Sequence, residues 1–228
     1  MRNLKILGLA FVAMLAMSAV AASAASADDK LTAESYPATL TGEKDGEFKD
    51  VFTSTAGSIT CTNPKYHGEL TAAATTVAAT ANYGETAEKQ CTAFGFPATI
   101  HMNGCSYLFH VTAGTLTELS VDIVCPVGQE ITITANPSEH GLTQKCTVHV
   151  PAQNGLETVT ATNIGAGATR DITLDINIEK IKYTHTAGTG LGACASGSGT
   201  TGQLSARATI KADVGKTAVQ QGLFMSAV

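Results

Sequence analysis

Several residue types are scarce in this chain, and each scarcity excludes a class of function. Tryptophan is absent and only 5% of the 228 residues are aromatic, so a broad aromatic platform for sugars is not expected. Lys and Arg number 14 against 19 Asp and Glu, which gives a net charge of −5. A chain of this sign lacks the basic stripe that nucleic-acid phosphates and anionic membranes require. No cysteine occurs in the first sixty residues, so we expect no lipoprotein anchor there.

The N-terminal residues have the three zones of a secretory signal peptide. Residues 1–5 carry Arg2 and Lys5, residues 6–20 are apolar and uncharged, and residues 21–27 are small and end in Ala-Ser-Ala. The apolar run is short for a membrane span, which needs about 20 residues. We predict a signal peptide over 1–27, with cleavage after Ala24 and a retained anchor helix as the alternatives. Its removal changes the net charge from −5 to −7 and leaves a secreted or extracellular chain without a membrane span.

The remaining composition indicates an all-β protein. Threonine, which is β-branched and tolerates a half-exposed pleated surface, occurs 33 times and glycine 22 times. We predict a loose polar leader over 28–35 and a single β domain over 36–228. The alternative is two small β subdomains divided near 126–130 or 151–156.

The cysteines of an exported chain are expected to form disulfides. A metal site is disfavoured, because no Cys-x-x-Cys occurs and the gaps of 14 to 48 residues match no zinc module. Spacing alone does not fix the connectivity. We predict three bridges from the six cysteines, which are Cys61, Cys91, Cys105, Cys125, Cys146 and Cys194.

One bridge follows from strand register. Odd-numbered residues are apolar both from Cys105 to Val111 and from Leu119 to Cys125, and Gly114 supplies a turn between the two runs. A hairpin centred on Thr115 pairs residues whose numbers sum to 230, which puts every apolar partner on one face and Cys105 opposite Cys125. Neighbour order then pairs Cys61 with Cys91 and Cys146 with Cys194.

Alternating apolar and polar residues predict many further strands. Residues 69–74 are left open between helix and strand, and 85–90 form a charged loop or one helical turn. Turns are expected at 42–46 and 153–155, and long loops at 136–144 and 186–202. The predicted strands, besides the hairpin, are 36–40, 49–54, 58–62, 75–83, 97–102, 131–134, 146–150, 157–163, 171–179, 203–213 and 222–227.

The apolar phase changes within the clearest strand. Ile172, Leu174, Ile176 and Ile178 are even-numbered, whereas the next apolar residues are Ile181 and Tyr183. We therefore predict a β-bulge near Glu179-Lys180. Many short strands with turn signals and no βαβ rhythm predict an antiparallel β-sandwich or barrel-like domain with three disulfides.

Five short motifs occur in a fixed order: Cys91-Thr92-Ala93-Phe94-Gly95, Asn103-Gly104-Cys105, Cys125-Pro126-Val127-Gly128, Cys146-Thr147-Val148 and Ile181-Lys182-Tyr183-Thr184. Over residues 40–211 the chain resembles a group of uncharacterised, secreted, six-cysteine β-rich bacterial proteins of unknown function. The resemblance implies export to the bacterial cell exterior and a β fold. It supplies no catalytic residues. The charged segment before Cys91 is longer than is usual in the group.

No motif for catalysis, cofactor binding or metal binding is present, so we assign no residue to any of these roles. Gly-x-Ser-x-Gly, His-Glu-x-x-His, Ser-x-x-Lys and nucleotide-binding loops are all missing. His110 and His149 are predicted to face outward and are candidates for metal ligands, or for an acid and base with Asp122. An ordinary exposed imidazole is the simpler reading of each.

Two further groups of side chains are candidates for binding. The acidic row Asp171, Asp175 and Glu179 is a candidate Ca²⁺ site or surface for a cationic partner, but a solvated strand face explains it more simply. The tyrosines are candidates for sugar stacking: Tyr36, Tyr66, Tyr83, Tyr107 and Tyr183.

The function that this sequence favours is a secreted or surface-associated β protein that binds or shields an extracellular ligand or protein. One alternative is an extracellular hydrolase whose site is built from dispersed His and carboxylates. A hydrolase would need a histidine within reach of both an acid and a hydroxyl. The other alternative is a secreted inhibitor or defence-type binding protein, for which the 186–202 loop is a candidate contact.

Overall fold

The computed structural model describes residues 29–84, 90–136, 145–186 and 196–227. Over these ranges the chain is built from antiparallel strands, with one short 3-10 helix at Gly167–Thr169. The all-β prediction is confirmed for this part of the chain. The predicted signal peptide, the charged segment 85–89, and most of the 136–144 and 186–202 loops lie outside it. Among the described residues, no helix has the length and hydropathy needed to cross a membrane.

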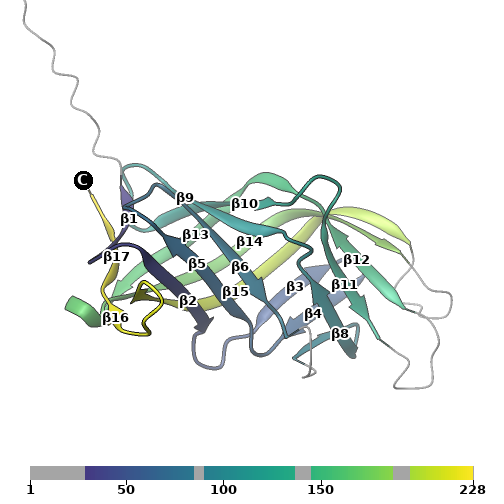
Figure 1. The fold of residues 1–228 in the computed structure, drawn as a ribbon. Coiled ribbons are helices and arrows are strands. Elements are labelled where there is room, and N and C mark those ends of the chain that lie inside the picture. Colours follow the sequence, from purple (N-terminus) through teal and green to yellow (C-terminus); the bar gives the residue numbers. More distant parts are fainter. Residues whose placement is uncertain (1–28, 85–89, 137–144, 187–195, 228) are drawn as a thin grey trace, which may run out of the picture.

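The strand pairings close into two rings that share two long strands (Figure 1). The shared strands are β14 (Asp171–Thr186) and β15 (Gly197–Val214), which pair from Ile172↔Ile210 to His185↔Gly197. The other strands of the first ring are, in spatial order, β2 (Ala38–Lys44), β5 (Lys65–Leu70), β6 (Thr76–Asn82), β9 (Ser106–Val111), β10 (Glu118–Val124) and β13 (Gln153–Ile164).

The second ring uses a different part of the β14–β15 pair, where both strands have other outer partners. β14 changes partner from β13 at 171–176 to β12 at 184–186, and β15 changes from β2 at 208–214 to β3 at 203–205. Its other strands are β12 (Cys146–Val150), β11 (Ile131–Ala135), β8 (Phe96–His101), β7 (Cys91–Ala93), β4 (Gly57–Cys61) and β3 (Asp50–Ser54). The chain therefore passes between the rings several times, and one buried apolar cluster runs through both.

The predicted bulge in the long strand is confirmed. The β14–β15 register shifts between Ile178 and Ile181, and Lys180 adopts a φ of 61°. The extra residue brings Ile181 and Tyr183 to the same buried side as Ile178. Ile178, Ile181 and Tyr183, each 2% exposed, therefore all face the core, although the inward positions change from even to odd numbers.

The predicted hairpin and two of the predicted bridges are also confirmed. All the β9–β10 partners have numbers that sum to 230, from Leu119↔Val111 to Val124↔Ser106. Cys105 is bonded to Cys125, and Cys61 to Cys91. The third predicted bridge involves Cys194, which lies outside the described residues, so that pairing stays a prediction.

The leader over 28–35 is not loose, contrary to the prediction. Residues 30–33 form β1 (Lys30–Ala33), which pairs with β17 (Leu223–Ser226) in a separate two-stranded sheet. Alternate residues of this sheet, Leu31, Leu223 and Met225, turn inward against the first ring. The sequence did not predict β1, because a strand of four residues is too short to show an alternating pattern. We call the β1–β17 sheet the cap.

Other boundaries differ from the predictions for local reasons. The Asn154-Gly155 signal marks a bulge within β13 and not a turn, since Gly155 has a φ of 67° and three residues of β13 span two of β10. Residues 197–202, expected in a loop, belong to β15 because they pair with β14 despite their many glycines. Strands β5 and β7 were missed, and β16 (Gln220–Gln221) is a short addition beside β15.

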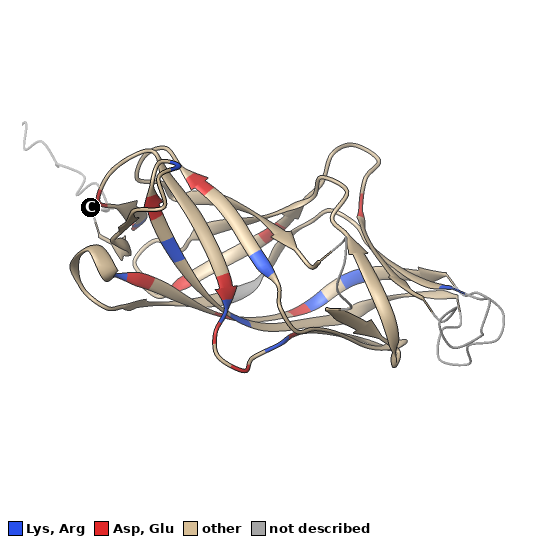
Figure 2. Cartoon of the chain, turned by 60° about the horizontal axis from the view of Figure 1, so that its bottom comes forward, with Lys and Arg blue, Asp and Glu red and all other residues tan. Residues whose placement is uncertain are grey.

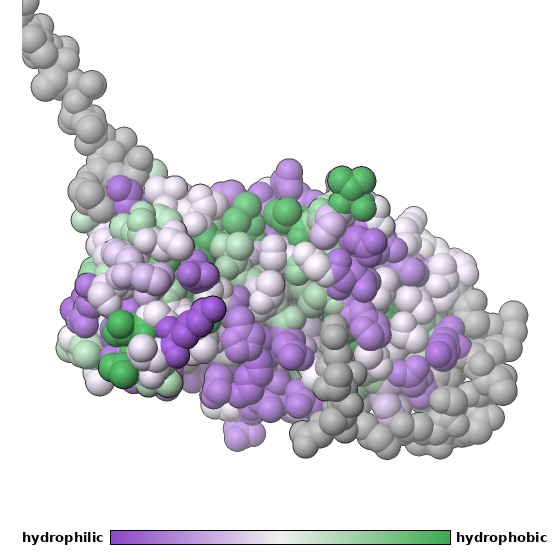
Figure 3. Space-filling model, in the orientation of Figure 1, coloured by the Kyte–Doolittle hydropathy of each residue, from purple (hydrophilic) through white to green (hydrophobic). Residues whose placement is uncertain are grey.

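The surface carries mixed charge and scattered apolar residues. The positions of acidic and basic residues are interspersed along the cartoon in Figure 2. In Figure 3 the hydrophobic residues of the visible face form separate spots between hydrophilic ones. The most exposed apolar side chains, Val127, Val219 and Phe48, belong to different turns.

Candidate binding cavity

An apolar cavity occupies the interior of the first ring. The centre of a water-sized molecule can move through about 80 Å³ of it. Every second residue of each strand faces inward, because successive side chains of a strand point to opposite sides. These inward residues form the wall of the cavity. They include Leu40, Val77, Ala79, Phe109, Leu119, Val121, Leu174, Ile176, Ala208 and Ile210.

Small residues on three neighbouring strands, β2, β5 and β6, line the cavity. Gly42 on β2 pairs with Tyr66 on β5, and a Cβ at Gly42 would come within 2.6 Å of the Ile210 side chain. Gly68 and Ala79 are paired across β5 and β6 and also line the cavity. The cap contributes Leu31, Leu223 and Met225 to the lining of the cavity.

A second, smaller cavity lies in the second ring. A water-sized molecule's centre can move through about 50 Å³ of it. Isoleucines from strands β4, β8, β10, β11 and β14 form nearly half of its wall. Four residues line both cavities: Tyr83, Tyr107, Ile178 and Leu204. The two cavities therefore adjoin at the level where the rings meet.

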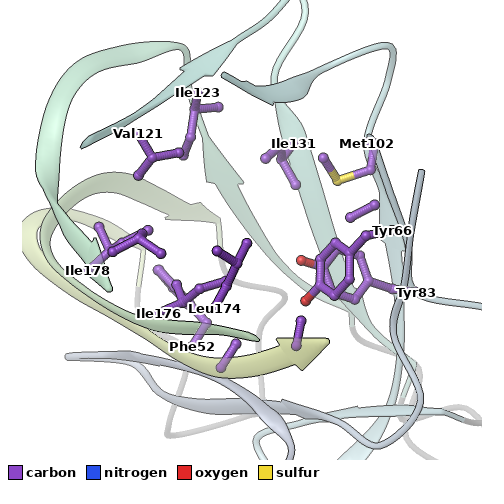
Figure 4. Packing of buried hydrophobic residues seen from close by; sticks show 14 of the residues in the cluster. Phe52, Tyr66, Tyr83, Met102, Val121, Ile123, Ile131, Leu174, Ile176 and Ile178 are labelled. Atoms are coloured by element: carbon purple, nitrogen blue, oxygen red, sulfur yellow. The ribbon is translucent and has the colours of Figure 1, made fainter. Parts of the chain in front are cut away.

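Polar side chains gather at this junction. Asp50, at the start of β3, is 4% exposed and lines the smaller cavity, and its Oδ2 accepts a hydrogen bond from the hydroxyl of Tyr66. The hydroxyls of Tyr83 and Tyr107 are hydrogen-bonded at 3.1 Å. Figure 4 shows Tyr66 and Tyr83 close together, surrounded by apolar side chains that include Met102 and Ile131. We call Asp50, Tyr66, Tyr83 and Tyr107 the tyrosine–aspartate cluster.

Burial sets the protonation of this cluster. Loss of solvation raises the pKa of Asp50 to about 6 from an ordinary 3.8, although the hydrogen bond from Tyr66 opposes the shift. Burial also raises the pKa of Tyr66 and Tyr83 well above 10. The tyrosines therefore stay neutral hydrogen-bond donors at every pH at which the protein is expected to work, and Asp50 is the one member of the cluster that titrates near neutrality.

The histidines considered at the sequence level do not form one site. His110 on β9 contacts Asp122 at 3.0 Å, whereas His149 on β12 contacts Glu130 at 2.6 Å. The two strands belong to different rings and are not neighbours, so the two histidines are not brought together as ligands of one metal ion. In the hydrogen bonds of the described residues neither imidazole is joined by a Ser or Thr hydroxyl, so the hydrolase hypothesis gains no support.

The acidic row on β14 is used by neighbouring side chains. Asp171 is 8% exposed and accepts a hydrogen bond from Gln220, so it does not point outward as predicted. Asp175 pairs with Arg207 at 3.2 Å, and Glu179 accepts from Gln203. The described residues contain no group of three or more His, Cys, Asp or Glu arranged to hold a metal ion.

The tyrosines considered for sugar stacking are mostly internal. Tyr66, Tyr83 and Tyr183 are at most 8% exposed, so their faces are covered. Sequence reasoning missed their association with Asp50. One signal was available: Asp50 and Phe52 have the same parity on β3, so an inward Phe52 implies an inward carboxylate. The disulfide cysteines flank this region, since Cys61 pairs with Asp50 across β3 and β4.

Comparison with known proteins gives no relative. No protein-family model, no curated protein and no solved structure matches the chain. The resemblance to secreted six-cysteine proteins accordingly stays a prediction, and functional inference rests on the cavity.

Proposed function

We propose that this chain is an exported, non-catalytic binding protein that holds a small apolar molecule inside its first ring. The apolar cavity within a closed set of eight strands carries the proposal. A ring of about this size has an interior that side chains fill or that accommodates one small ligand. Here the side chains leave space, and an apolar cavity of this kind excludes water and favours apolar guests.

The architecture suits a binding role. Strands on all sides fix the wall of the cavity. The Cys105–Cys125 bridge joins the ends of β9 and β10, and Cys61–Cys91 joins β4 to β7. A preformed site binds without an ordering penalty. Export through a signal peptide over 1–27 and a third bridge, Cys146–Cys194, belong to the same proposal. The two bridges support it, because disulfides persist in oxidising compartments outside the cytoplasm.

The test compares two leucine substitutions on one strand. Ala79 lines the cavity, whereas its neighbour Ala78 is exposed on the outer face of β6. Binding of heptyl methyl ether, an apolar probe without a donor group, is measured by calorimetry for the wild type, Ala79→Leu and Ala78→Leu. We expect Ala79→Leu to weaken binding about tenfold or more, since each methylene of ligand displaced loses about 0.8 kcal/mol. Ala78→Leu should bind as the wild type does.

Failure of the ether to bind the wild type, or an equal loss in both variants, would contradict the proposal. Export is tested separately by non-reducing mass mapping of protein recovered outside the cell. That measurement reports the mature N-terminus and all bridges together. A chain recovered with free thiols and an intact N-terminal segment would contradict export.

A further inference from the structure

The carboxylate of Asp50 has one oxygen with a partner and one without. Oδ2 accepts the hydrogen bond from Tyr66, while Oδ1 is buried and has no hydrogen-bond partner among the described residues. Asp50 is 4% exposed and lines the smaller cavity next to Tyr83 and Tyr107. A buried acceptor left without a partner is unfavourable and is rare in folded proteins. Oδ1 is therefore an acceptor that a hydrogen-bond donor from a bound molecule would satisfy.

The surroundings of Oδ1 define the chemistry of that occupant. The lining of the smaller cavity, as far as the structure describes it, contains no Lys, Arg or His that could neutralise the carboxylate. Apart from the tyrosine–aspartate cluster, the wall is apolar, with residues such as Ile59, Ile100 and Ile133. A group that donates a hydrogen bond, or carries a positive charge, would satisfy Oδ1, whereas a second carboxylate would be repelled.

We propose that the ligand is an apolar molecule with one donor head group, a hydroxyl or a protonated amine, that binds Asp50 Oδ1. This rests on the proposed function: the apolar body occupies the first-ring cavity, and the head group reaches past Tyr83 and Tyr107, which line both cavities. Asp50 selects the head group through Oδ1, and the Tyr66 hydroxyl occupies the other carboxylate oxygen, Oδ2.

The test uses four probes of matched size: 1-octanol, octylamine, octanoate and heptyl methyl ether. The alcohol and the ether contain the same atoms, but only the alcohol donates a hydrogen bond. Affinities are measured at pH 7.5 for the wild type, Asp50→Asn and Glu118→Gln. Glu118 is an exposed carboxylate on β10 and provides the matched control for replacing an acid by its amide.

We expect the wild type to bind octanol and octylamine at least about tenfold more tightly than the ether, with octanoate the weakest, because a hydrogen bond to a buried charged acceptor is strong. Asp50→Asn should lose the preference for octylamine and keep its affinity for the ether, and Glu118→Gln should match the wild type. Retained ether binding by Asp50→Asn also shows that the variant is folded.

The outcomes separate the two proposals. If the wild type binds all four probes equally, the cavity binds apolar ligands but the role of Asp50 is wrong. If no probe binds, the proposed function itself fails. A second variant, Tyr66→Phe, leaves both carboxylate oxygens without a partner, so it should keep or increase the preference for octylamine over the ether. Loss of that preference in Tyr66→Phe, with ether affinity unchanged, would also overturn the inference that Asp50 selects the head group.

Discussion

Tyr66 and Asp50 form a buried hydrogen bond that joins the two rings. Tyr66 lies on β5 of the first ring, and Asp50 lies on β3 of the second. No ladder of strand pairs connects β5 to β3 directly, so this side-chain contact adds to the link made by the shared strands. The other carboxylate oxygen of Asp50 is buried without a hydrogen-bond partner among the described residues, and Asp50 lines the smaller cavity.

Asp50 is expected to make the stability of the protein depend on pH. Its pKa is about 6 in the folded chain, against an ordinary 3.8, so the folded state binds more protons between these values. The free energy of unfolding should therefore fall as pH rises from about 4 to about 6, by an amount on the order of 3 kcal/mol, and then level off. Urea denaturation of the wild type and Asp50→Asn across this range measures the effect. Asp50→Asn should lack that fall.

The exposed Glu118 provides the control for this measurement. Glu118→Gln should leave the difference between pH 4 and pH 6 unchanged, because its carboxylate is solvated in both states. Parallel pH profiles for the wild type and Asp50→Asn would mean that Asp50 is not the residue responsible.

The Cys105–Cys125 bridge is expected to contribute strongly to stability. It closes a loop with a sequence separation of 20 residues. Replacing both cysteines by alanine should lower the free energy of unfolding by about 3 kcal/mol, mainly because the unfolded chain gains freedom. Equilibrium unfolding in urea without reductant measures this. A loss smaller than about 1 kcal/mol would show that the β9–β10 hairpin persists in the unfolded chain.

Lys180 occupies a backbone conformation that favours glycine. Its φ of 61° lies in the left-handed region, at the bulge of β14. Lys180→Gly should therefore raise the free energy of unfolding by up to about 1 kcal/mol, whereas the β-branched Lys180→Val should lower it by about 1–2 kcal/mol. Thermal unfolding of the two variants distinguishes them. The opposite order would imply that the bulge is absent in solution.

Asn163 is expected to hold the cap against the first ring. Its side chain accepts a hydrogen bond from the Met225 amide at 2.9 Å and donates one to the Met225 carbonyl at 3.2 Å. Asn163→Ala should speed amide hydrogen exchange in β1 and β17 and lower stability by about 1 kcal/mol. Asn177→Ala, an exposed change on β14, serves as the control. If Asn163→Ala instead speeds amide hydrogen exchange only in strands other than β1 and β17, Asn163 does not attach the cap.

Local pattern was sufficient to predict the hairpin and the bulge. Cys105 opposite Cys125 followed from alternation on two adjacent runs, since a shift of one residue would have turned every apolar side chain outward. The bulge near Lys180 followed from a change of parity. In both cases the information lay within a few residues, where the period of a strand is visible.

The closure of the rings was not predictable in the same way. Alternation states which face of a strand is buried but not which distant strand lies beside it. The pairing of β15 with β2 joins residues about 170 positions apart, and no local signal specifies it. The tyrosine–aspartate cluster was missed for the same reason, because Asp50 and Tyr107 come together only when both rings are closed.

One strand, β15, completes both rings although it comes late in the chain. Until residues 197–214 are synthesised, β2 and β3 present open backbone edges to the solvent, and such edges readily pair with other molecules. The polypeptide should therefore be at its greatest risk of aggregation just before this segment becomes available. Export of an unfolded polypeptide across a membrane would delay strand pairing until β15 is present and both rings can close.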